Sequence, residues 1–208
     1  MIERAQRGLM VIVSAPSGTG KTRLLAELRE HLPDCAYSIS ATTRPPREGE
    51  VNDVSYHYWT AESFQSAIAA GALMEFAEYM GHHYGTPREP VERWLAEDRV
   101  VLFDLDVQGA HALKLAHPEC VTVFLLPPSH EELSERLRLR GTDAPDQIAR
   151  RLARADAEIA QAPFYDYLVI NRQLEEATQQ LVAIVAAEQC RATRWKFASP
   201  PGSTASHV

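Results

Sequence analysis

Short runs of apolar residues recur along the chain, separated by longer amphipathic stretches. Four of these runs consist mainly of Val, Leu, Ile and Phe, and they cover residues 9–13, 100–103, 121–126 and 167–170. Continuous apolar runs of this length are typical of strands that are buried on both faces. Because they alternate with helical patterns, the sequence predicts an α/β fold with a mostly parallel sheet flanked by helices.

The amphipathic stretches predict helices. In the first one, four leucines between residues 24 and 32 fall on one stripe, and Pro33 should end the helix. A second helix covers about residues 61–70, with Thr60 as its N-cap. Further helices are expected at about residues 89–97, 129–140, 145–160 and 175–192.

Two segments depart from this alternation. Residues 40–87 are polar, aromatic and arginine-bearing, whereas residues 136–156 hold a cluster of arginines. We interpret both as insertions mounted on the sheet. The predicted organisation is a core of residues 1–39, 88–133 and 157–197, a first insertion of residues 40–87, a second insertion of residues 134–156 and a tail of residues 198–208. Because the tail is small and polar, we expect it to be disordered.

The composition narrows the possible partners. The 208 residues carry 21 Lys and Arg against 28 Asp and Glu, which gives a formal net charge of −7. This balance argues against a nucleic-acid partner, because nucleic-acid binders need basic surfaces. No stretch has the apolar length of a membrane span, and residues 1–8 are too charged for a signal peptide. We expect a cytoplasmic protein in which Cys35, Cys120 and Cys190, which lack paired spacing, are reduced thiols.

The clearest chemical motif follows the first predicted strand. Residues 15–22 read Ala-Pro-Ser-Gly-Thr-Gly-Lys-Thr, a phosphate-binding loop in which alanine replaces the first glycine. Gly18 and Gly20 free the backbone to wrap an anion, and the following helix adds the partial positive charge of its N-terminus. Lys21 would reach the β- and γ-phosphates, and the Thr22 hydroxyl would bind Mg²⁺. The predicted nucleotide-phosphate site comprises Ala15, Pro16, Ser17, Gly18, Thr19, Gly20, Lys21 and Thr22.

This loop does not identify the reaction. A glycine-rich turn with a surface lysine is one alternative reading of the motif. Phosphate-binding loops occur in GTPases, transport ATPases, helicases and small-molecule kinases, which catalyse different reactions. The second substrate must therefore be sought elsewhere in the chain.

A second anion site is predicted in the first insertion. Arg44 and Arg47 flank two prolines, which favour a polyproline II path with about three residues per turn. At that period the two guanidinium groups face the same way, so both can close on one phosphate. Tyr56 and Tyr84 would add neutral hydroxyl donors. In the alternative, the segment is a solvated loop whose arginines pair with the glutamates that follow them.

Arginines gather again in the second insertion. Arg136 and Arg140 share one face of a predicted helix, and Arg150, Arg151 and Arg154 lie on the next helix. A closing segment, or lid, that brings in arginines would stabilise the charge that phosphoryl transfer spreads over several oxygens. It would also exclude water. The alternative is a pair of solvated helix faces with acidic partners four residues away.

Several short motifs together resemble those of the guanylate kinase family. They are Ser40-x-Thr-Thr-Arg44-x-Pro-Arg47-x-Gly-Glu50 followed by Tyr56, then Glu75, Tyr84-Gly-Thr86 and Asp104-x-Asp106-x-x-Gly109. The resemblance extends from about residue 9 to residue 190. It implies a P-loop kinase that transfers the γ-phosphoryl group of ATP to GMP with Mg²⁺, giving ADP and GDP, and that accepts dGMP too.

The resemblance also implies roles for individual residues. The catalytic residues would be Lys21, Arg44, Arg136, Arg140 and Arg151. GMP would be bound by Ser40, Arg44, Arg47, Tyr56, Glu75, Tyr84, Thr86 and Asp106. Guanine presents N1–H and N2–H₂ donors, which a carboxylate accepts, and O6, which a hydroxyl can reach. Thr22 would hold Mg²⁺ with Asp104 acting through water, and Asn171 would lie near adenine.

Some positions fall outside these roles. Asp53 stands where the family more often has glycine, and Arg172 stands where aspartate is expected. Arg150 and Arg154 are expected to be solvated. His82 and His83 are expected in a loop, because no third metal ligand has suitable spacing.

Two other functions remain compatible with parts of the sequence. Guanylate-kinase-like domains of scaffold proteins keep the fold without the chemistry, although Lys21 and the lid arginines are present here. A kinase for another phosphorylated acceptor, such as a ribose bisphosphate, would not require Glu75. The sequence does not distinguish a monomer from a homo-oligomer.

Overall fold

The computed structural model describes residues 2–4, 8–139 and 145–197 of the chain. Two predictions concern residues outside these ranges. The tail of residues 198–208 and the lid residue Arg140 lie outside the described residues.

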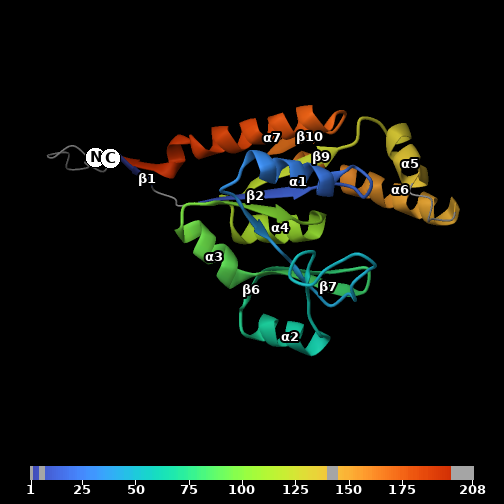
Figure 1. The fold of residues 1–208 in the computed structure, drawn as a ribbon, viewed down its shortest axis with the longest axis horizontal. Coiled ribbons are helices and arrows are strands. Elements are labelled where there is room, and N and C mark those ends of the chain that lie inside the picture. Colours follow the sequence, from blue (N-terminus) through green and yellow to red (C-terminus); the bar gives the residue numbers. More distant parts are fainter. Residues whose placement is uncertain (1, 5–7, 140–144, 198–208) are drawn as a thin grey trace, which may run out of the picture.

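The core is a five-stranded parallel sheet, which confirms the predicted fold class (Figure 1). Its strands follow the order β10–β9–β2–β8–β3, and every neighbouring pair is parallel. They are β2 (Leu9–Ser14), β3 (Ala36–Ser38), β8 (Val100–Asp104), β9 (Val121–Leu126) and β10 (Tyr167–Ile170). Four of them confirm the predicted strands. The fifth, β3, is too short to form a recognisable apolar run.

Both faces of this sheet are covered, which explains why its strands are apolar at consecutive positions. Successive side chains of β2 point to opposite faces. Val11 and Val13 pack in a cluster with residues of α1 (Lys21–His31) and α7 (Leu174–Gln189), whereas Ile12 packs with residues of α3 (Arg88–Ala96) and α4 (Val107–Ala116). In Figure 1, α1 and α7 lie above the strands, and α3 and α4 lie below them.

Among the α-helices of the described core, α4 is the one that the sequence pattern misses. Its buried positions include Gly109 and Ala110, so its apolar stripe is weak, and Leu113 is its one large buried residue. Its N-cap is Asp106, whose carboxylate accepts a 2.8 Å hydrogen bond from the N–H of Gly109. The cap fixes the turn that joins β8 to α4.

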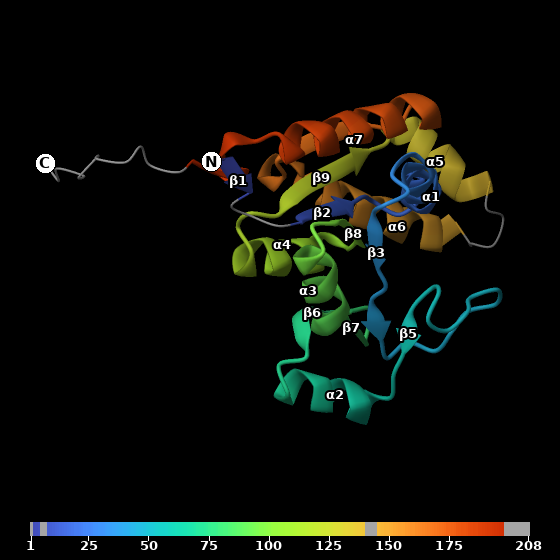
Figure 2. The same ribbon diagram turned by 60° about the vertical axis from the view of Figure 1, so that its left-hand side comes forward.

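The other predicted helices are confirmed, with ends shifted by at most three residues. They include α2 (Ala61–Ala69), α5 (His130–Leu139) and α6 (Pro145–Ile159). Thr60 caps α2 as predicted, since its side chain accepts a 3.1 Å hydrogen bond from the N–H of Ser63. Helices α5 and α6 pack against each other and lie beside α1 (Figure 2). Their shared core consists of Leu133, Leu137, Leu152 and Ala155.

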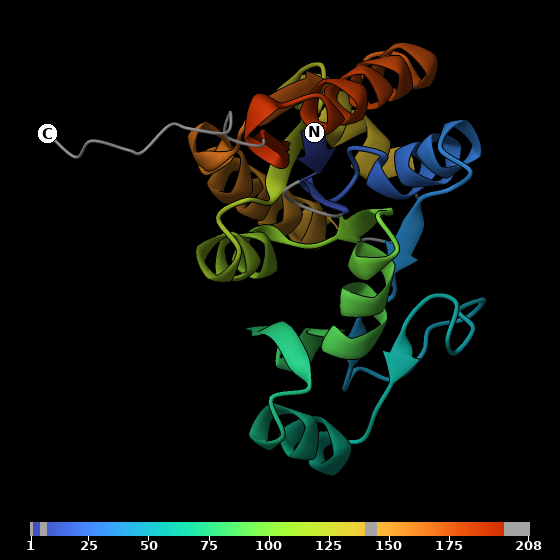
Figure 3. The ribbon, with the colours of Figure 1, turned by 90° about the vertical axis from the view of Figure 1, so that its left-hand side faces the viewer.

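A second sheet lies within the first insertion, where only one helix was predicted. Its strands follow the order β5–β4–β7–β6, and they are β4 (Ala41–Thr42), β5 (His57–Tyr58), β6 (Leu73–Tyr79) and β7 (His82–Pro87). With α2 it projects from the core on the side opposite α7 (Figure 3). The expectation that His82 and His83 lie in a loop is wrong, because both belong to β7. The ring of His83 stacks on Phe64 of α2, with a centroid distance of 5.5 Å.

The two ends of the described chain pair with each other. Strand β1 (Ile2–Arg4) is antiparallel to β11 (Trp195–Phe197). Short 3₁₀ helices, η1 (Ala162–Phe164) and η2 (Ala192–Arg194), precede β10 and β11. Among the described residues, no helix combines the length and apolar character that a membrane span requires.

Candidate active site

The phosphate-binding loop connects the carboxyl end of β2 to the first turn of α1. Gly18 and Gly20 adopt φ angles of 94° and 97°, in the left-handed region where a side chain is strained. A Cβ atom on Gly20 would also lie 2.9 Å from the side-chain nitrogen of Asn171. Ala15 is not among the residues with positive φ, so this position does not need the glycine that the motif usually has.

Lys21 lies between the loop and the end of β8. Its Nζ is 2.5 Å from Oδ1 of Asp104 and donates a 2.9 Å hydrogen bond to the carbonyl oxygen of Leu105. The hydroxyl of Tyr37 donates a 3.4 Å hydrogen bond to the other carboxylate oxygen of Asp104. Burial and the nearby Asp104 raise the pKa of Tyr37, so the phenol stays neutral. Sequence analysis did not find Tyr37, because β3 itself was not predicted.

Oxygen ligands suited to Mg²⁺ lie beside this lysine. Thr22 has an exposed side chain in the first turn of α1, and Asp104 ends the neighbouring strand. Within the described part of the chain, no group of three or more His, Cys, Asp and Glu side chains could hold a metal ion. One hydroxyl and one carboxylate fit a magnesium ion that takes its other ligands from phosphates and water, which is its usual mode in kinases.

Arg44 is the centre of a polar cluster on the second sheet. Its guanidinium donates hydrogen bonds of 2.9 Å to each carboxylate oxygen of Glu50, and a 3.3 Å bond to the hydroxyl of Tyr84. Its side chain is buried, and it lies 5.3 Å from the ring centre of Tyr56. The pairing of Arg44 with Glu50, which the alternative reading placed in a solvated loop, is therefore present, but Arg44 is buried.

Glu50 organises this cluster, and sequence reasoning gave it no role beyond its place in the motif. Besides Arg44, it accepts a 2.7 Å hydrogen bond from the backbone N–H of Arg47 and a 2.8 Å bond from the hydroxyl of Tyr58. The Arg44 guanidinium lowers the pKa of Glu50 to about 2, so the carboxylate is ionised at neutral pH. The side chain of Arg47 is exposed. Of Arg47, only the backbone N–H is seen to contact the Arg44 cluster among the described residues, so the convergence of both guanidinium groups on one phosphate stays a prediction.

The tyrosines of the cluster lie edge to face. The ring of Tyr56 is 5.9 Å from that of Tyr84, and burial raises the pKa of Tyr56 to about 12. Tyr56 is thus a neutral hydroxyl donor. The turn before it depends on Asp53, which adopts φ 63° in the left-handed region. The Asp53 carboxylate lies 2.6 Å from Nδ1 of His57. Asp53 thus adopts the backbone conformation that a glycine would adopt more easily.

Glu75 and Thr86 are polar residues of the second sheet, Ser40 lies just before its strand β4, and Asp106 caps α4 of the core beside it. The carboxylate of Glu75 is buried and accepts a 2.7 Å hydrogen bond from the hydroxyl of Thr86. Burial, with a smaller contribution from the charge of Asp106, raises the pKa of Glu75 to about 7. Gly109 leaves room for this carboxylate, because a Cβ atom there would lie 3.2 Å from its Oε2. Ser40 is also buried, on the segment between β3 and β4.

Two arginines of α5 and α6 contact the phosphate-binding loop. Arg136 donates 3.4 Å hydrogen bonds to the carbonyl oxygens of Thr19 and Asn171, and a 3.1 Å bond to Glu132, its predicted partner on the helix. Arg151 donates a 2.6 Å hydrogen bond to the hydroxyl of Ser17. The loop therefore receives one arginine from each helix.

Arg154 differs from the expectation that it is only solvated. Its side chain is exposed, but its guanidinium lies 4.6 Å from the ring centre of Tyr79 on β6. This contact joins α6 to the second sheet. Glu158, one turn further along α6, is half-buried, and burial raises its pKa. Sequence reasoning found neither Tyr79 nor Glu158, because both depend on contacts between distant segments. Arg150 is exposed, as expected.

A cavity of about 440 Å³ opens beside the loop, on the side of α5 and α7. Its volume lies in the range of small-molecule sites. Asn171 is one of its lining residues, and its side-chain amide donates a 2.7 Å hydrogen bond to the carbonyl oxygen of Thr19. The cavity is lined by residues 18–20, Arg23, Arg136, Leu139, Asn171, Arg172 and Leu174.

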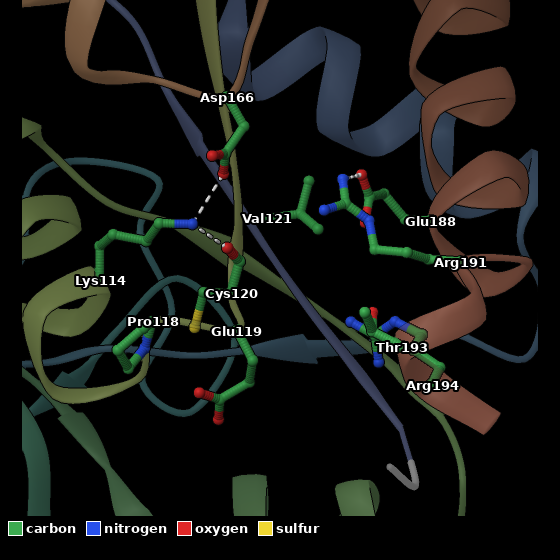
Figure 4. Close-up of a pocket in the computed structure, with 10 residues that line it drawn as sticks. All are labelled: Lys114, Pro118, Glu119, Cys120, Val121, Asp166, Glu188, Arg191, Thr193 and Arg194. Atoms are coloured by element: carbon green, nitrogen blue, oxygen red, sulfur yellow. Dashed lines mark hydrogen bonds and ion pairs between the residues drawn. The ribbon is translucent and has the colours of Figure 1, made fainter. Parts of the chain in front are cut away.

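A smaller cavity lies at the opposite end of the sheet, where β9 and β10 begin (Figure 4). Four of its charged groups pair with one another. Lys114 lies 2.9 Å from Asp166, and Arg191 contacts the buried Glu188. Since ligands of parallel α/β sheets bind at the carboxyl ends of the strands, this cavity is not part of the candidate site.

Comparisons with known proteins agree with this arrangement. The family model described as guanylate kinase matches residues 7–188. A guanylate kinase of Anaeromyxobacter dehalogenans is 50% identical over 191 residues, which cover 90% of this chain and 84% of that protein. A guanylate kinase of Sphingopyxis alaskensis is 47% identical over 190 residues, which cover 91% of this chain and 86% of that protein.

A solved structure gives the same result. The crystal structure of guanylate kinase from Anaplasma phagocytophilum superposes with a TM-score of 0.76 at 31% identity, and the match covers 94% of this chain and 92% of that one. Both the sequence and the fold thus match over nearly the whole chain. The protein belongs to the guanylate kinase family.

Proposed function

We propose that the protein transfers the γ-phosphoryl group of ATP to GMP, giving ADP and GDP, and that it also accepts dGMP. One observation carries this proposal. The three-residue turn from Asp104 to Asp106 contacts both halves of the site, because Asp104 pairs with Lys21 of the loop and Asp106 lies near the buried carboxylate of Glu75. A triphosphate on the loop and a nucleotide on the second sheet would therefore meet at this turn.

The base of the acceptor would be read by buried polar groups. The hydroxyl of Thr86 donates a hydrogen bond to Oε1 of Glu75 and would so orient the carboxylate toward the N1–H and N2–H₂ groups of guanine. Asp106 is a second carboxylate for these donors. The hydroxyl of Ser40 is left to reach O6.

The phosphate of GMP would be bound by Arg44, Arg47, Tyr56 and Tyr84. Glu50 holds the guanidinium of Arg44 with both carboxylate oxygens, so that arginine is already positioned before the acceptor binds. Tyr56 remains a neutral donor at physiological pH, since its pKa is about 12. Two arginines and two neutral hydroxyls would thus bind the phosphate with less positive charge than four cationic side chains would carry.

Transfer would proceed in line, from the γ-phosphorus to an oxygen of the GMP phosphate, without a covalent enzyme intermediate. The anionic acceptor needs no general base. Lys21, Arg136, Arg140 and Arg151 would stabilise the charge on the transferred group. Thr22, with Asp104 through water, would hold Mg²⁺, which neutralises charge on the β- and γ-phosphates when it is bound.

The division of the chain follows from these roles. Residues 40–87 are the proposed GMP-binding region and residues 134–156 the proposed lid, and the remainder forms the core. A reducing compartment such as the cytoplasm suits the three free cysteines, Cys35, Cys120 and Cys190.

A panel of acceptors tests the proposal. ADP formation from ATP is measured with GMP, dGMP, AMP, CMP and UMP, and we expect turnover with GMP and dGMP far above that with the other three. A binding module would give no turnover with any acceptor. A kinase for a different phosphorylated acceptor would leave GMP no better than AMP. Either result would overturn the proposal.

A further inference from the structure

The cavity beside the phosphate-binding loop carries an inference about the phosphoryl donor, and this inference rests on the proposed function. Lys21 and Asp104 mark the end of the loop where the γ-phosphate would lie. The cavity lies at the other end, between residues 18–20 and the start of α7. The base of a triphosphate bound on the loop would therefore occupy it.

The polar groups of this cavity are mainly hydrogen-bond donors. Three of its lining residues are arginines, Arg23, Arg136 and Arg172, and none of its lining residues is acidic. Arg136 is held by the carbonyl oxygens of Thr19 and Asn171. In the described part of the chain, the guanidinium groups of Arg23 and Arg172 are exposed and make no contact with an acceptor. Their donors are available to a ligand.

Asn171 adds one acceptor to these donors. Its side-chain nitrogen is used on the carbonyl oxygen of Thr19, so its side-chain oxygen is left to accept from a ligand such as the amino group of adenine. Leu139 and Leu174 supply apolar surface for the faces of a base, and Leu139 is 83% exposed. The cavity thus offers apolar contact, one amide acceptor and cationic donors to its occupant.

The position of Arg172 makes it the residue that would meet the edge of the base. It directly follows Asn171 at the end of β10, and its own N–H donates a 3.0 Å hydrogen bond to the carbonyl oxygen of Ile170, which fixes the turn. Arg23 lies instead in the first turn of α1, next to the loop that would hold the phosphates.

Arginine donors distinguish the two purines. Guanine and hypoxanthine present O6 and N7 side by side, and both atoms accept hydrogen bonds, so a guanidinium can bind them with two parallel bonds. Adenine presents its N6 amino group beside N7, so one donor of the guanidinium would face another donor. We propose that the donor site accepts GTP and ITP in addition to ATP, and that Arg172 recognises their 6-oxo group.

The reaction with GTP balances in a simple way. An oxygen of the GMP phosphate forms a bond to the γ-phosphorus of GTP, and the bond from that phosphorus to the β–γ bridging oxygen breaks. The bridging oxygen leaves with GDP, and the phosphorylated acceptor is a second GDP. With fully ionised phosphates, no proton is released or taken up.

The test compares three donors at saturating GMP. Chromatography measures the formation of GDP, and of ADP or IDP, with ATP, GTP or ITP as donor. We expect kcat/KM for GTP and for ITP to lie within about 10-fold of the value for ATP. ITP isolates the 6-oxo group, because hypoxanthine lacks the 2-amino group of guanine.

Variants assign the effect to Arg172. In Arg172→Ala the ratio of kcat/KM for GTP to that for ATP should fall about 10- to 100-fold, as expected for the loss of a bidentate base contact. Arg172→Asp should lower this ratio further, because a carboxylate favours the amino group of adenine. Arg138→Ala is the matched control, since Arg138 is an exposed arginine of α5 that does not line the cavity.

Each outcome decides a separate point. Turnover with ATP but not with GTP or ITP overturns the inference and leaves the proposed function intact. No turnover with ATP refutes the proposed function itself. If Arg172→Ala lowers activity with ATP and GTP equally, Arg172 binds phosphate or ribose, and its role at the base is refuted.

Discussion

Thr86 on β7 donates a 2.7 Å hydrogen bond to Oε1 of Glu75 on the neighbouring strand β6. Both side chains are buried, and the bond fixes the direction of the carboxylate. Burial favours the neutral form of a carboxyl group, so the same environment that orients Glu75 also brings its pKa close to physiological pH.

The first prediction concerns the pH dependence of GMP use. Since the pKa of Glu75 is raised to about 7, the carboxyl is protonated below that pH and can no longer accept from guanine N1–H. We expect kcat/KM for GMP to fall as the pH drops from about 8 to about 6. Glu75→Gln is the control, because it keeps the titration of the GMP phosphate but lacks that of Glu75. Parallel profiles for the two proteins would refute this role.

The same pKa predicts an effect on stability. The carboxyl of Glu75 titrates near 7 in the folded protein and near 4.5 when unfolded, so the folded state binds more protons between these values. Its contribution to the free energy of unfolding therefore falls as the pH rises through this window. The melting temperature of Glu75→Gln minus that of the original protein should therefore increase as the pH rises from about 5 to about 8. A constant difference would show that Glu75 is not buried as described.

Glu50 provides a prediction about the acceptor phosphate. Glu50→Gln keeps the shape of the side chain but removes the charge that holds Arg44. KM for GMP should rise about 5- to 10-fold, because charged hydrogen bonds contribute most to such positioning, and KM for ATP should change little. Glu48→Gln is the matched control, since Glu48 is exposed on the same loop. Equal values for both variants would exclude a positioning role for Glu50.

The contact between Arg154 and Tyr79 predicts a smaller effect. It joins α6 to the second sheet, so it should help the proposed lid close over the acceptor. A cation–π contact at an exposed site is worth about 0.5–1 kcal/mol, and Arg154→Met should therefore raise KM for GMP about 2- to 5-fold. Tyr79→Phe, which keeps the ring, should have little effect. If Tyr79→Phe matches Arg154→Met, the hydroxyl rather than the ring carries the interaction.

The sequence predicted the parts of the fold that have a strong local pattern. Strand β2 is apolar throughout because it is buried on both faces, and α1 has a leucine stripe because one of its faces packs on the sheet. The loop between them has its own motif. In the second sheet, β4 and β5 have only two residues each, too few to show alternation, and the longer β6 and β7 do not alternate apolar and polar residues regularly. Helix α4 was missed because its buried face includes Gly109 and Ala110.

The candidate site divides in the same way. Lys21 became a candidate because the residue types and spacing of the phosphate-binding loop indicate its chemistry, whereas Glu75 became a candidate only through the resemblance to the guanylate kinase family. Contacts between distant segments were not found. Arg154 and Tyr79 are 75 positions apart in the sequence, and only the folded chain brings them within 4.6 Å. The pairing of Arg44 with Glu50 was considered, but its burial depends on the second sheet.

The most direct test of the account is the choice between GMP and AMP in the original protein and in Glu75→Gln. Adenine has an unprotonated N1 where guanine has a donor, so AMP would set a lone pair against the carboxylate of Glu75. Sites built around hydrogen bonds reject such mismatches strongly. We predict that Glu75→Gln lowers kcat/KM for GMP about 10-fold or more and narrows the preference for GMP over AMP, because the amide can present a donor to adenine N1. Unchanged GMP kinetics together with unchanged selectivity would contradict the assignment of Glu75 to guanine.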